Sequence, residues 1–285
     1  MKNKFGLLAI LFKVGPKILS LIVKSGKFIL VGVSFAAYSY VYSWQFAVII
    51  LSMLIVHEYG HIWAMQRCGI KTKGIYLIPF VGGLAVSDGM AKSRWDEVYI
   101  AMMGPVFGLA LSVLSLIVYY ITANPLYAAT ASWMAMVNIF NLFPVTPLDG
   151  GRVLKSIALS IDTRVGIWYM FGALLLMLAA VVLLGLWTFM VLIIIGGLEL
   201  YFEYSRYKMQ KVLKELESKK HLYSESDAEF IGKLVDQHMD RTESLDNVGR
   251  VKSMVFYIAV LVALYLVMHL MSGEPGAAMA FEMLR

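Results

Sequence analysis

Two histidines and a glutamate lie close together in an otherwise apolar stretch, MLIVHEYGHIWAM at Met53–Met65. His57 and His61 are four residues apart and therefore share one face of a helix, where two imidazoles can bind one Zn²⁺. Glu58 lies about 100° around the helix and can reach a water on that metal. Zinc lowers the pKa of bound water towards about 7, and a carboxylate can take its proton and deliver one to a leaving amine. The pattern predicts hydrolysis of a peptide bond.

Two histidines and a water leave one position on the metal for a further protein ligand. We expect Asp149 to fill it, because two prolines in FNLFPVTPLDGGRVL, Phe140–Leu154, break an apolar segment just before this carboxylate. Broken backbone at membrane depth is tolerated only where it lines a cavity or is buried in protein. Glu199 and Glu203 are the competing ligands, although an anchor at the membrane interface is the preferred interpretation of both.

The composition is that of a membrane protein with several spans. Hydrophobic residues make up 60% of the 285, charged residues 15%, and the mean hydropathy is +0.73. Soluble domains average roughly 45–50% apolar and about 25% charged residues. The net charge of +6 would suggest nucleic-acid binding in a soluble protein, but here it first calls for a test of membrane topology. The single cysteine, Cys68, excludes an intrachain disulfide.

The predicted fold is an all-α polytopic membrane protein with about six to seven transmembrane helices and a short membrane-associated β-hairpin after the histidine helix. The apolar segments approach the roughly 20 residues that cross a bilayer. They lie at about 28–42, 46–65, 98–121, 126–143, 165–184, 186–201 and 253–271.

The basic residues predict the orientation of these spans. With a cytoplasmic N-terminus, 24 of the 25 lysines and arginines fall in segments on the cytoplasmic side. We therefore expect a multi-pass protein of the plasma membrane, with its N-terminus inside and its C-terminus outside. His57 and Asp149 would then both lie near the cytoplasmic face, at the same depth.

Four regions are predicted along the chain. Residues 1–27 place lysines on one side of an amphipathic lead-in, and residues 28–205 form the transmembrane core. Residues 206–250 read as two charged cytoplasmic helices broken near Ser224. Residues 251–285 contain the seventh span and an extracytoplasmic tail.

Four short motifs together resemble the site-2 protease family, peptidase family M50. His57–His61 is similar to the zinc-binding helix of that family, and PLDGG at Pro147–Gly151 to its second motif. LIPFVGGLAV at Leu77–Val86 is similar to the strand region that follows the zinc helix, and Gly104-Pro105 to the start of the next core span. The resemblance covers about 46–154, in the order and spacing of the family.

The resemblance implies roles for particular residues. It makes Glu58 the catalytic base, and the ligands of one Zn²⁺ per chain become His57, His61 and Asp149. Asn141 takes the position of a family asparagine, where it would stabilise an oxyanion or orient substrate, or else form hydrogen bonds between helices. Substrate binding is also expected at Gly82 and Gly83, on a strand edge within 75–86 that would hold an unwound peptide. A purely structural hairpin is the alternative for that edge.

The resulting hypothesis is an intramembrane zinc endopeptidase that cuts transmembrane segments of other proteins, for regulated release of a membrane-held protein or clearance of signal-peptide remnants. The expected partners are a transmembrane protein substrate, the lipid bilayer and a possible regulatory membrane protein, and no nucleic acid. Two alternatives stay open: a catalytically silent relative that binds membrane proteins as a scaffold, and an ion or solute transporter that uses Glu58 and Asp149 as relay carboxylates.

Overall fold

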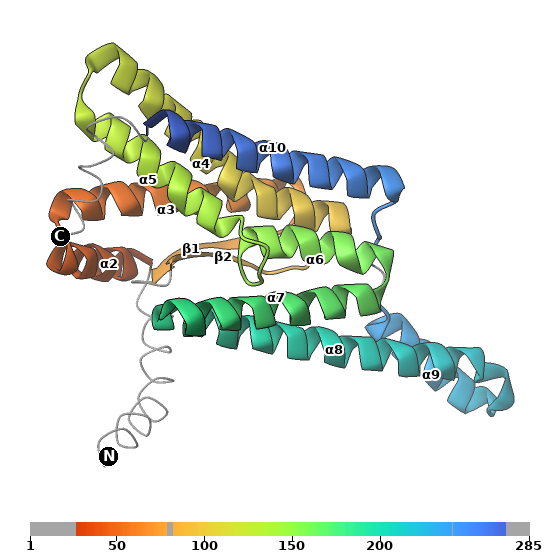
Figure 1. Cartoon of the computed structure of the whole chain (residues 1–285). Coiled ribbons are helices and arrows are strands. Elements are labelled where there is room, and N and C mark those ends of the chain that lie inside the picture. Colours follow the sequence, from red (N-terminus) through yellow and green to blue (C-terminus); the bar gives the residue numbers. More distant parts are fainter. Residues whose placement is uncertain (1–26, 79–81, 241, 272–285) are drawn as a thin grey trace. The chain divides into compact units, whose positions relative to one another are not determined.

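The computed structural model describes residues 27–78, 82–240 and 242–271, which are mostly helical (Figure 1). The helices α2 to α10 span Lys27–Val41, Trp44–Arg67, Arg94–Thr122, Pro125–Asn141, Asp149–Ile161, Thr163–Leu184, Met190–Ser218, Glu225–His238 and Asn247–Met271. The strands β1 and β2 span Thr72–Ile78 and Gly82–Ser87. The described residues fall into two compact units, the first from the described parts of 27–88, 106–136 and 266–271 and the second from those of 89–105 and 137–265.

The apolar segments predicted from the sequence all fall on helices. Within the described chain, α3, α4, α7 and α10 are long and apolar enough to cross a membrane. The protein is therefore a helical membrane protein, but a count of six or seven spans is not confirmed. The helices α2 and α5 have only 15 and 17 residues, and α8 becomes charged along its length. The predicted lead-in lies outside the described residues, except for Lys27.

The first unit contains the predicted strand region as a two-stranded antiparallel hairpin. Ile75 pairs with Ala85 and Leu77 with Gly83. Leu77 is buried in a cluster with residues of α2 and α3, and its carbonyl accepts a hydrogen bond from Ser34 Oγ at 3.2 Å. The helix α3 contacts both strands, whereas α2 contacts β1. The hairpin is thus held against the helix that carries the two histidines.

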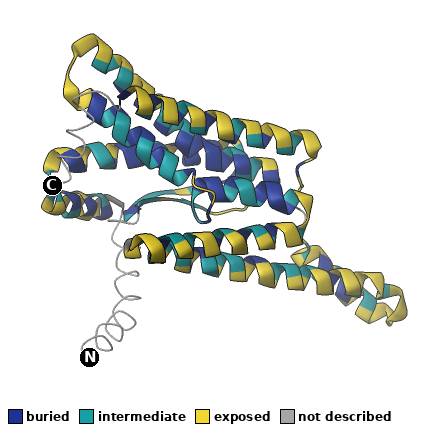
Figure 2. Cartoon of the chain, viewed as in Figure 1, coloured by how far each residue is buried: buried dark blue, intermediate teal, exposed yellow. Residues whose placement is uncertain are grey.

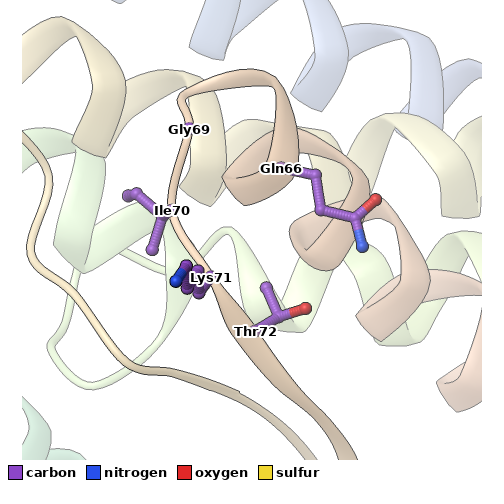
Figure 3. A pocket seen from close by; sticks show the side chains of 5 residues that line it. All are labelled: Gln66, Gly69, Ile70, Lys71 and Thr72. Atoms are coloured by element: carbon purple, nitrogen blue, oxygen red, sulfur yellow. The ribbon is translucent and has the colours of Figure 1, made fainter.

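A tight turn connects α3 to β1. Gly69 has a φ of +73°, which favours glycine, and the amide of Ile70 donates to the carbonyl of Met65 at 2.8 Å. Figure 3 shows a shallow cavity at this turn, lined by Gln66, Gly69, Ile70, Lys71 and Thr72. The turn reverses the chain within a few residues, so that the strands run back along α3.

The second unit contains a helix that the hydropathy pattern does not predict. Residues 149–161 lie between the predicted spans 126–143 and 165–184, and they form α6. Its buried residues include Val153, Ser156 and Ile157, whereas Arg152 and Lys155 are only half buried. A search for apolar spans misses such a helix because one face is charged.

The turn between α5 and α6 is packed closely on backbone atoms. A Cβ added to Gly150 would lie 2.7 Å from the carbonyl oxygen of Phe143, and one added to Gly151 would lie 2.5 Å from that of Val145. Real Cβ atoms do not approach so closely. The two glycines of PLDGG are therefore required where α6 begins.

The charged segment 206–250 has the predicted break. The first charged helix is the continuation of α8, which ends at Ser218, and Ser224 caps α9 by accepting a hydrogen bond from the amide of Asp227. Figure 2 shows α8 and α9 largely exposed. The prediction of two helices is correct, but the first is not separate from the span before it.

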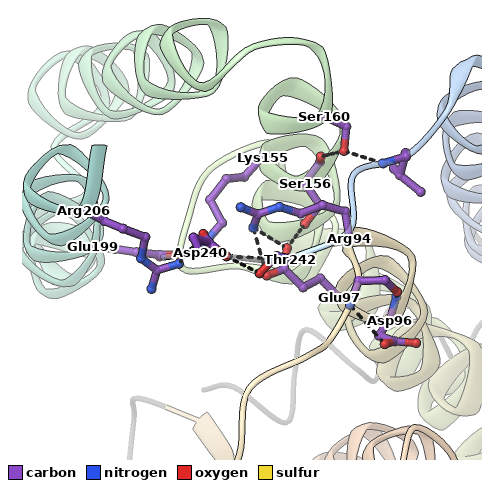
Figure 4. Close-up of polar contacts among 12 residues, drawn as sticks. Arg94, Asp96, Glu97, Lys155, Ser156, Ser160, Glu199, Arg206, Asp240 and Thr242 are labelled. Carbon is purple, nitrogen blue, oxygen red and sulfur yellow. Dashed lines mark hydrogen bonds and ion pairs between the residues drawn. The ribbon is translucent and has the colours of Figure 1, made fainter. Parts of the chain in front are cut away.

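A partly buried ion pair connects α4, α6 and the end of this segment (Figure 4). Arg94 Nη1 donates to both carboxylate oxygens of Glu97 at 3.0 and 2.9 Å, and Ser156 Oγ donates to Glu97 at 2.6 Å. The amide of Arg94 donates to the carbonyl of Glu243, and that of Leu245 donates to Ser160 Oγ. These contacts fix the start of α4 against α6.

Two neighbouring glycines of α8 provide a matched test of the packing in the second unit. A Cβ on Gly196 would lie 2.5 Å from the carbonyl oxygen of Thr146, whereas one on Gly197 would meet nothing within 4 Å. We expect Gly196→Ala to lower the melting temperature in detergent by several degrees, since overpacking costs about 1–3 kcal/mol. Gly197→Ala should leave it unchanged or raise it, because alanine favours helix. Equal melting temperatures would contradict the close contact between α8 and the turn.

Candidate metal and catalytic site

The helix α3 brings the two histidines of HEYGH together. It begins after Ser43, whose hydroxyl accepts a hydrogen bond from the amide of Phe46, and it runs without interruption to Arg67. His57 and His61 are both buried, and their Nε2 atoms lie 3.1 Å apart. Two nitrogens bound to one tetrahedral zinc at about 2.05 Å would be about 3.3 Å apart. The pair therefore fits a single metal ion.

Glu58 is buried on the same helix, next to the second strand. A Cβ added to Gly83 of β2 would lie 2.6 Å from Glu58 Oε1 and 2.7 Å from its Cδ. No residue larger than glycine fits there unless the glutamate moves. Gly82 has a φ of +117°, a conformation that L residues rarely adopt. Gly83 thus lets the strand backbone approach the carboxylate, and the role of both glycines in substrate binding stays a prediction.

Asp149 is the first residue of α6 and lies in the second unit. It is 7% exposed, and Arg152 Nη1 lies 3.7 Å from its Oδ1. A carboxylate in the first turn of a helix is stabilised by the positive end of the helix dipole. His57 and His61 belong to the first unit, so the role of Asp149 as a third ligand beside them stays a prediction.

The competing carboxylates have other surroundings. Glu199 of α8 forms an ion pair with Lys155 of α6, as Figure 4 shows. Glu203, one turn further on, lines a separate cavity together with Arg206. The pairing of Glu199 with a lysine compensates its charge.

Asn141 is the last residue of α5 and is half buried. Asn138, one turn earlier, is fully buried and was not singled out from the sequence. The structure does not test the predicted role of Asn141 in stabilising an oxyanion or orienting substrate. Its place at the end of α5 puts it immediately before the turn that leads to Asp149.

Two tyrosines that the motifs did not reveal hold the turn before Asp149. Tyr257 Oη donates to the carbonyl of Leu142 at 2.6 Å, and Tyr169 Oη donates to that of Pro144 at 2.8 Å. Both lie in apolar helices, α10 and α7, where a tyrosine hydroxyl needs a polar partner. A tyrosine within an apolar segment is the sequence feature that could have identified both residues. That feature does not predict which carbonyl each hydroxyl would bind.

The comparison with protein families matches one model, peptidase family M50, over residues 45–134. The match includes His57, Glu58, His61 and the hairpin, and it ends before Asn141 and Asp149. The helix with the paired histidines therefore lies inside the family match, whereas the remaining predicted ligand lies beyond it.

Curated relatives are about a third identical to this chain within the aligned segments. A zinc metalloprotease of Methanocaldococcus jannaschii is 31% identical over 134 residues, 45% of this chain and 38% of that protein. Two further relatives are provisionally named zinc metalloproteases: Rip3 of Mycobacterium tuberculosis and a protein of Synechocystis sp. Each is 34% identical to this chain over 39% of this chain's length and 30% of its own length. The aligned part is less than two fifths of each relative. Through the segment that carries HEYGH, the chain is similar to peptidase family M50 and to proteins named as zinc metalloproteases.

Proposed function

We propose that the protein is an intramembrane zinc endopeptidase that hydrolyses peptide bonds in or near transmembrane segments of other proteins. The observation that carries this proposal is the pair of buried imidazoles on α3, 3.1 Å apart at Nε2, with Glu58 beside them. The family match over the same helix supports it, as do the names of the relatives. Regulated release of a membrane-held protein, or clearance of signal-peptide remnants, is the purpose we infer.

In this proposal His57, His61 and Asp149 hold one zinc ion. The donor set of two imidazoles and a carboxylate suits zinc, and it leaves one position free for water or substrate. When bound there, zinc would supply Lewis acidity and lower the pKa of a water that it holds. Glu58 accepts a proton from that water and then donates one to the amine that leaves. Burial of Glu58 beside β2 keeps its carboxylate in place for both transfers.

We further propose that the substrate binds as an extended strand along β2. A helical peptide bond is shielded by its own hydrogen bonds, so a substrate helix must unwind before it is cut. Among the described residues the sheet has two strands. One edge of β2 pairs with β1, and the other edge pairs with no described strand. Addition of the substrate to the other edge of β2 would satisfy its backbone and bring it close to Glu58, which lies against Gly83.

The surroundings of this reaction follow from the predicted topology. We propose a plasma-membrane location with the N-terminus in the cytoplasm, and a cut near the cytoplasmic side. The substrate is then a membrane protein, and a second membrane protein could regulate access. The charged segment 206–250 and the last span 251–285 would lie outside the catalytic core 46–154.

Removal of the proposed base tests the mechanism. We expect Glu58→Gln to lower cleavage of a reconstituted single-span substrate by at least about 100-fold, because general base catalysis is lost. Zinc content, measured by mass spectrometry of the metal, should stay at one ion per chain. Cleavage at the wild-type rate in this variant would refute the role of Glu58. A wild-type protein that binds zinc and cleaves no tested substrate would favour the scaffold.

Substitution of two carboxylates, one at a time, tests whether Asp149 or Glu199 is the third zinc ligand. We expect Asp149→Asn to weaken zinc binding by more than the 10–100-fold that loss of an outer partner costs. Glu199→Gln, the matched control, should retain zinc because Glu199 is engaged with Lys155. The measurement is the zinc dissociation constant in competition with a chelator. The reverse result would transfer the ligand role to Glu199.

The space beside Glu58 gives a third test. We expect Gly83→Ala to displace the glutamate and lower cleavage at least tenfold, while zinc is retained and the melting temperature changes little. Gly172→Ala is the control, since its added Cβ meets nothing within 4 Å. Full activity of Gly83→Ala would show that the hairpin does not limit the position of the base.

A further inference from the structure

The turn between α5 and α6, residues 142–148, leaves two backbone carbonyls without the amide donors that a helix would give them. Two prolines interrupt the helix pattern here, because proline has no amide hydrogen to donate. The amide of Leu148 donates to the carbonyl of Val145 at 2.9 Å, and not to that of Pro144 four residues before it. Among the described residues, no backbone amide donates to the carbonyl of Leu142 or of Pro144. Both carbonyls therefore depend on side chains or water.

Two tyrosines from other helices of the second unit supply these donors, in different surroundings. Tyr257 Oη of α10 donates to the carbonyl of Leu142 at 2.6 Å, and these two residues are only 8% and 1% exposed. Tyr169 Oη of α7 donates to the carbonyl of Pro144 at 2.8 Å, but Pro144 is exposed. Water can replace a lost donor at an exposed carbonyl, whereas a buried acceptor without a donor costs free energy. The turn therefore depends more on Tyr257 than on Tyr169.

The carbonyl that Tyr257 holds lies directly against the start of α6. A Cβ added to Gly150 would overlap the carbonyl oxygen of Leu142, so this oxygen packs on the backbone next to Asp149. Leu148 is the N-cap residue of α6, and its side chain makes no capping hydrogen bond. The first turn of α6 is thus positioned by its packing on the preceding turn and not by a side-chain cap. A displaced Leu142 carbonyl would therefore displace Asp149.

We propose that Tyr257 is a positioning residue for Asp149, acting through the carbonyl of Leu142, and that Tyr169 makes a smaller contribution of the same kind. The inference rests on the proposed function, in which Asp149 is a zinc ligand. Groups that orient a metal ligand without touching the metal commonly change the metal affinity by about 10–100-fold. The proposal gives α10, which lies beyond the family match at 45–134, a part in fixing this carboxylate.

Hydrogen exchange tests the positioning step without metal. It is measured by mass spectrometry on the full-length protein in detergent, after a chelator has removed zinc. We expect Tyr257→Phe to speed exchange in the peptide that contains Val145 and Leu148 about tenfold, because the turn loses its buried donor. Tyr169→Phe should speed it less. Unchanged exchange in Tyr257→Phe would overturn the proposal, since the turn would then not depend on this bond.

Zinc binding tests whether the tyrosine acts through Asp149. The dissociation constant is measured by competition with a chelator for the wild type, Tyr257→Phe, Asp149→Asn and the double variant. We expect Tyr257→Phe to weaken zinc binding about tenfold in the wild-type background. The same substitution should have almost no effect in the Asp149→Asn background, because the carboxylate that Tyr257 positions is absent. An equal loss in both backgrounds would refute the assigned route.

Tyr169→Phe is the milder variant of the same cycle. It should show the same dependence on Asp149 with a smaller loss of affinity, because water can reach the Pro144 carbonyl that it leaves. A larger loss in Tyr169→Phe than in Tyr257→Phe would contradict the primary role of the buried bond.

Ser112→Ala is the matched control. Ser112 is fully buried and its Oγ donates to the carbonyl of Ala131 at 2.7 Å, so this variant also loses a buried hydroxyl–carbonyl bond, but in the first unit. Both Ser112→Ala and Tyr257→Phe should lower the melting temperature, whereas only Tyr257→Phe should change zinc affinity and exchange in the turn. An equal loss of zinc in the two variants would count against the proposal, since general destabilisation would explain it.

The inference and the proposed function fail in different ways. If Asp149→Asn binds zinc as tightly as the wild type, the ligand role of Asp149 is wrong, and the positioning inference falls with it. If Asp149→Asn weakens zinc binding whereas Tyr257→Phe does not, the ligand role stands and only the positioning inference is refuted.

Discussion

The burial of two imidazoles within 3.1 Å of each other on one apolar helix is the constraint on which the rest of the proposed chemistry depends. This distance suits two nitrogens bound to one zinc ion, which would use both imidazoles as donors. The same burial keeps Glu58 away from bulk water, where a carboxylate would be free to move.

The hairpin of the first unit follows from this arrangement. A strand can approach a buried carboxylate only where it lacks a side chain, and Gly83 is that position. Pairing of β1 with β2, and the hydrogen bond from Ser34 to Leu77, hold the strand beside α3. The close approach is useful because it gives an incoming peptide a backbone template next to the proposed base.

The second unit satisfies its polar groups in two different ways. The broken backbone before Asp149 is stabilised by Tyr257 and Tyr169. Their hydroxyls donate hydrogen bonds to backbone carbonyls that lie beyond the end of α5. Arg94 and Glu97 satisfy each other, together with Ser156.

The sequence by itself determined what depends on local spacing. An interval of four residues places His57 and His61 on one helix face wherever that helix lies, and apolar length locates the helices. The strand region and the break near Ser224 also follow from short stretches of chain. Only the tertiary structure decided which carboxylate is paired with a lysine, that α6 begins at Asp149, and that Gly83 faces Glu58. Those facts depend on contacts between residues far apart in the chain, and composition and periodicity carry no information on such partners.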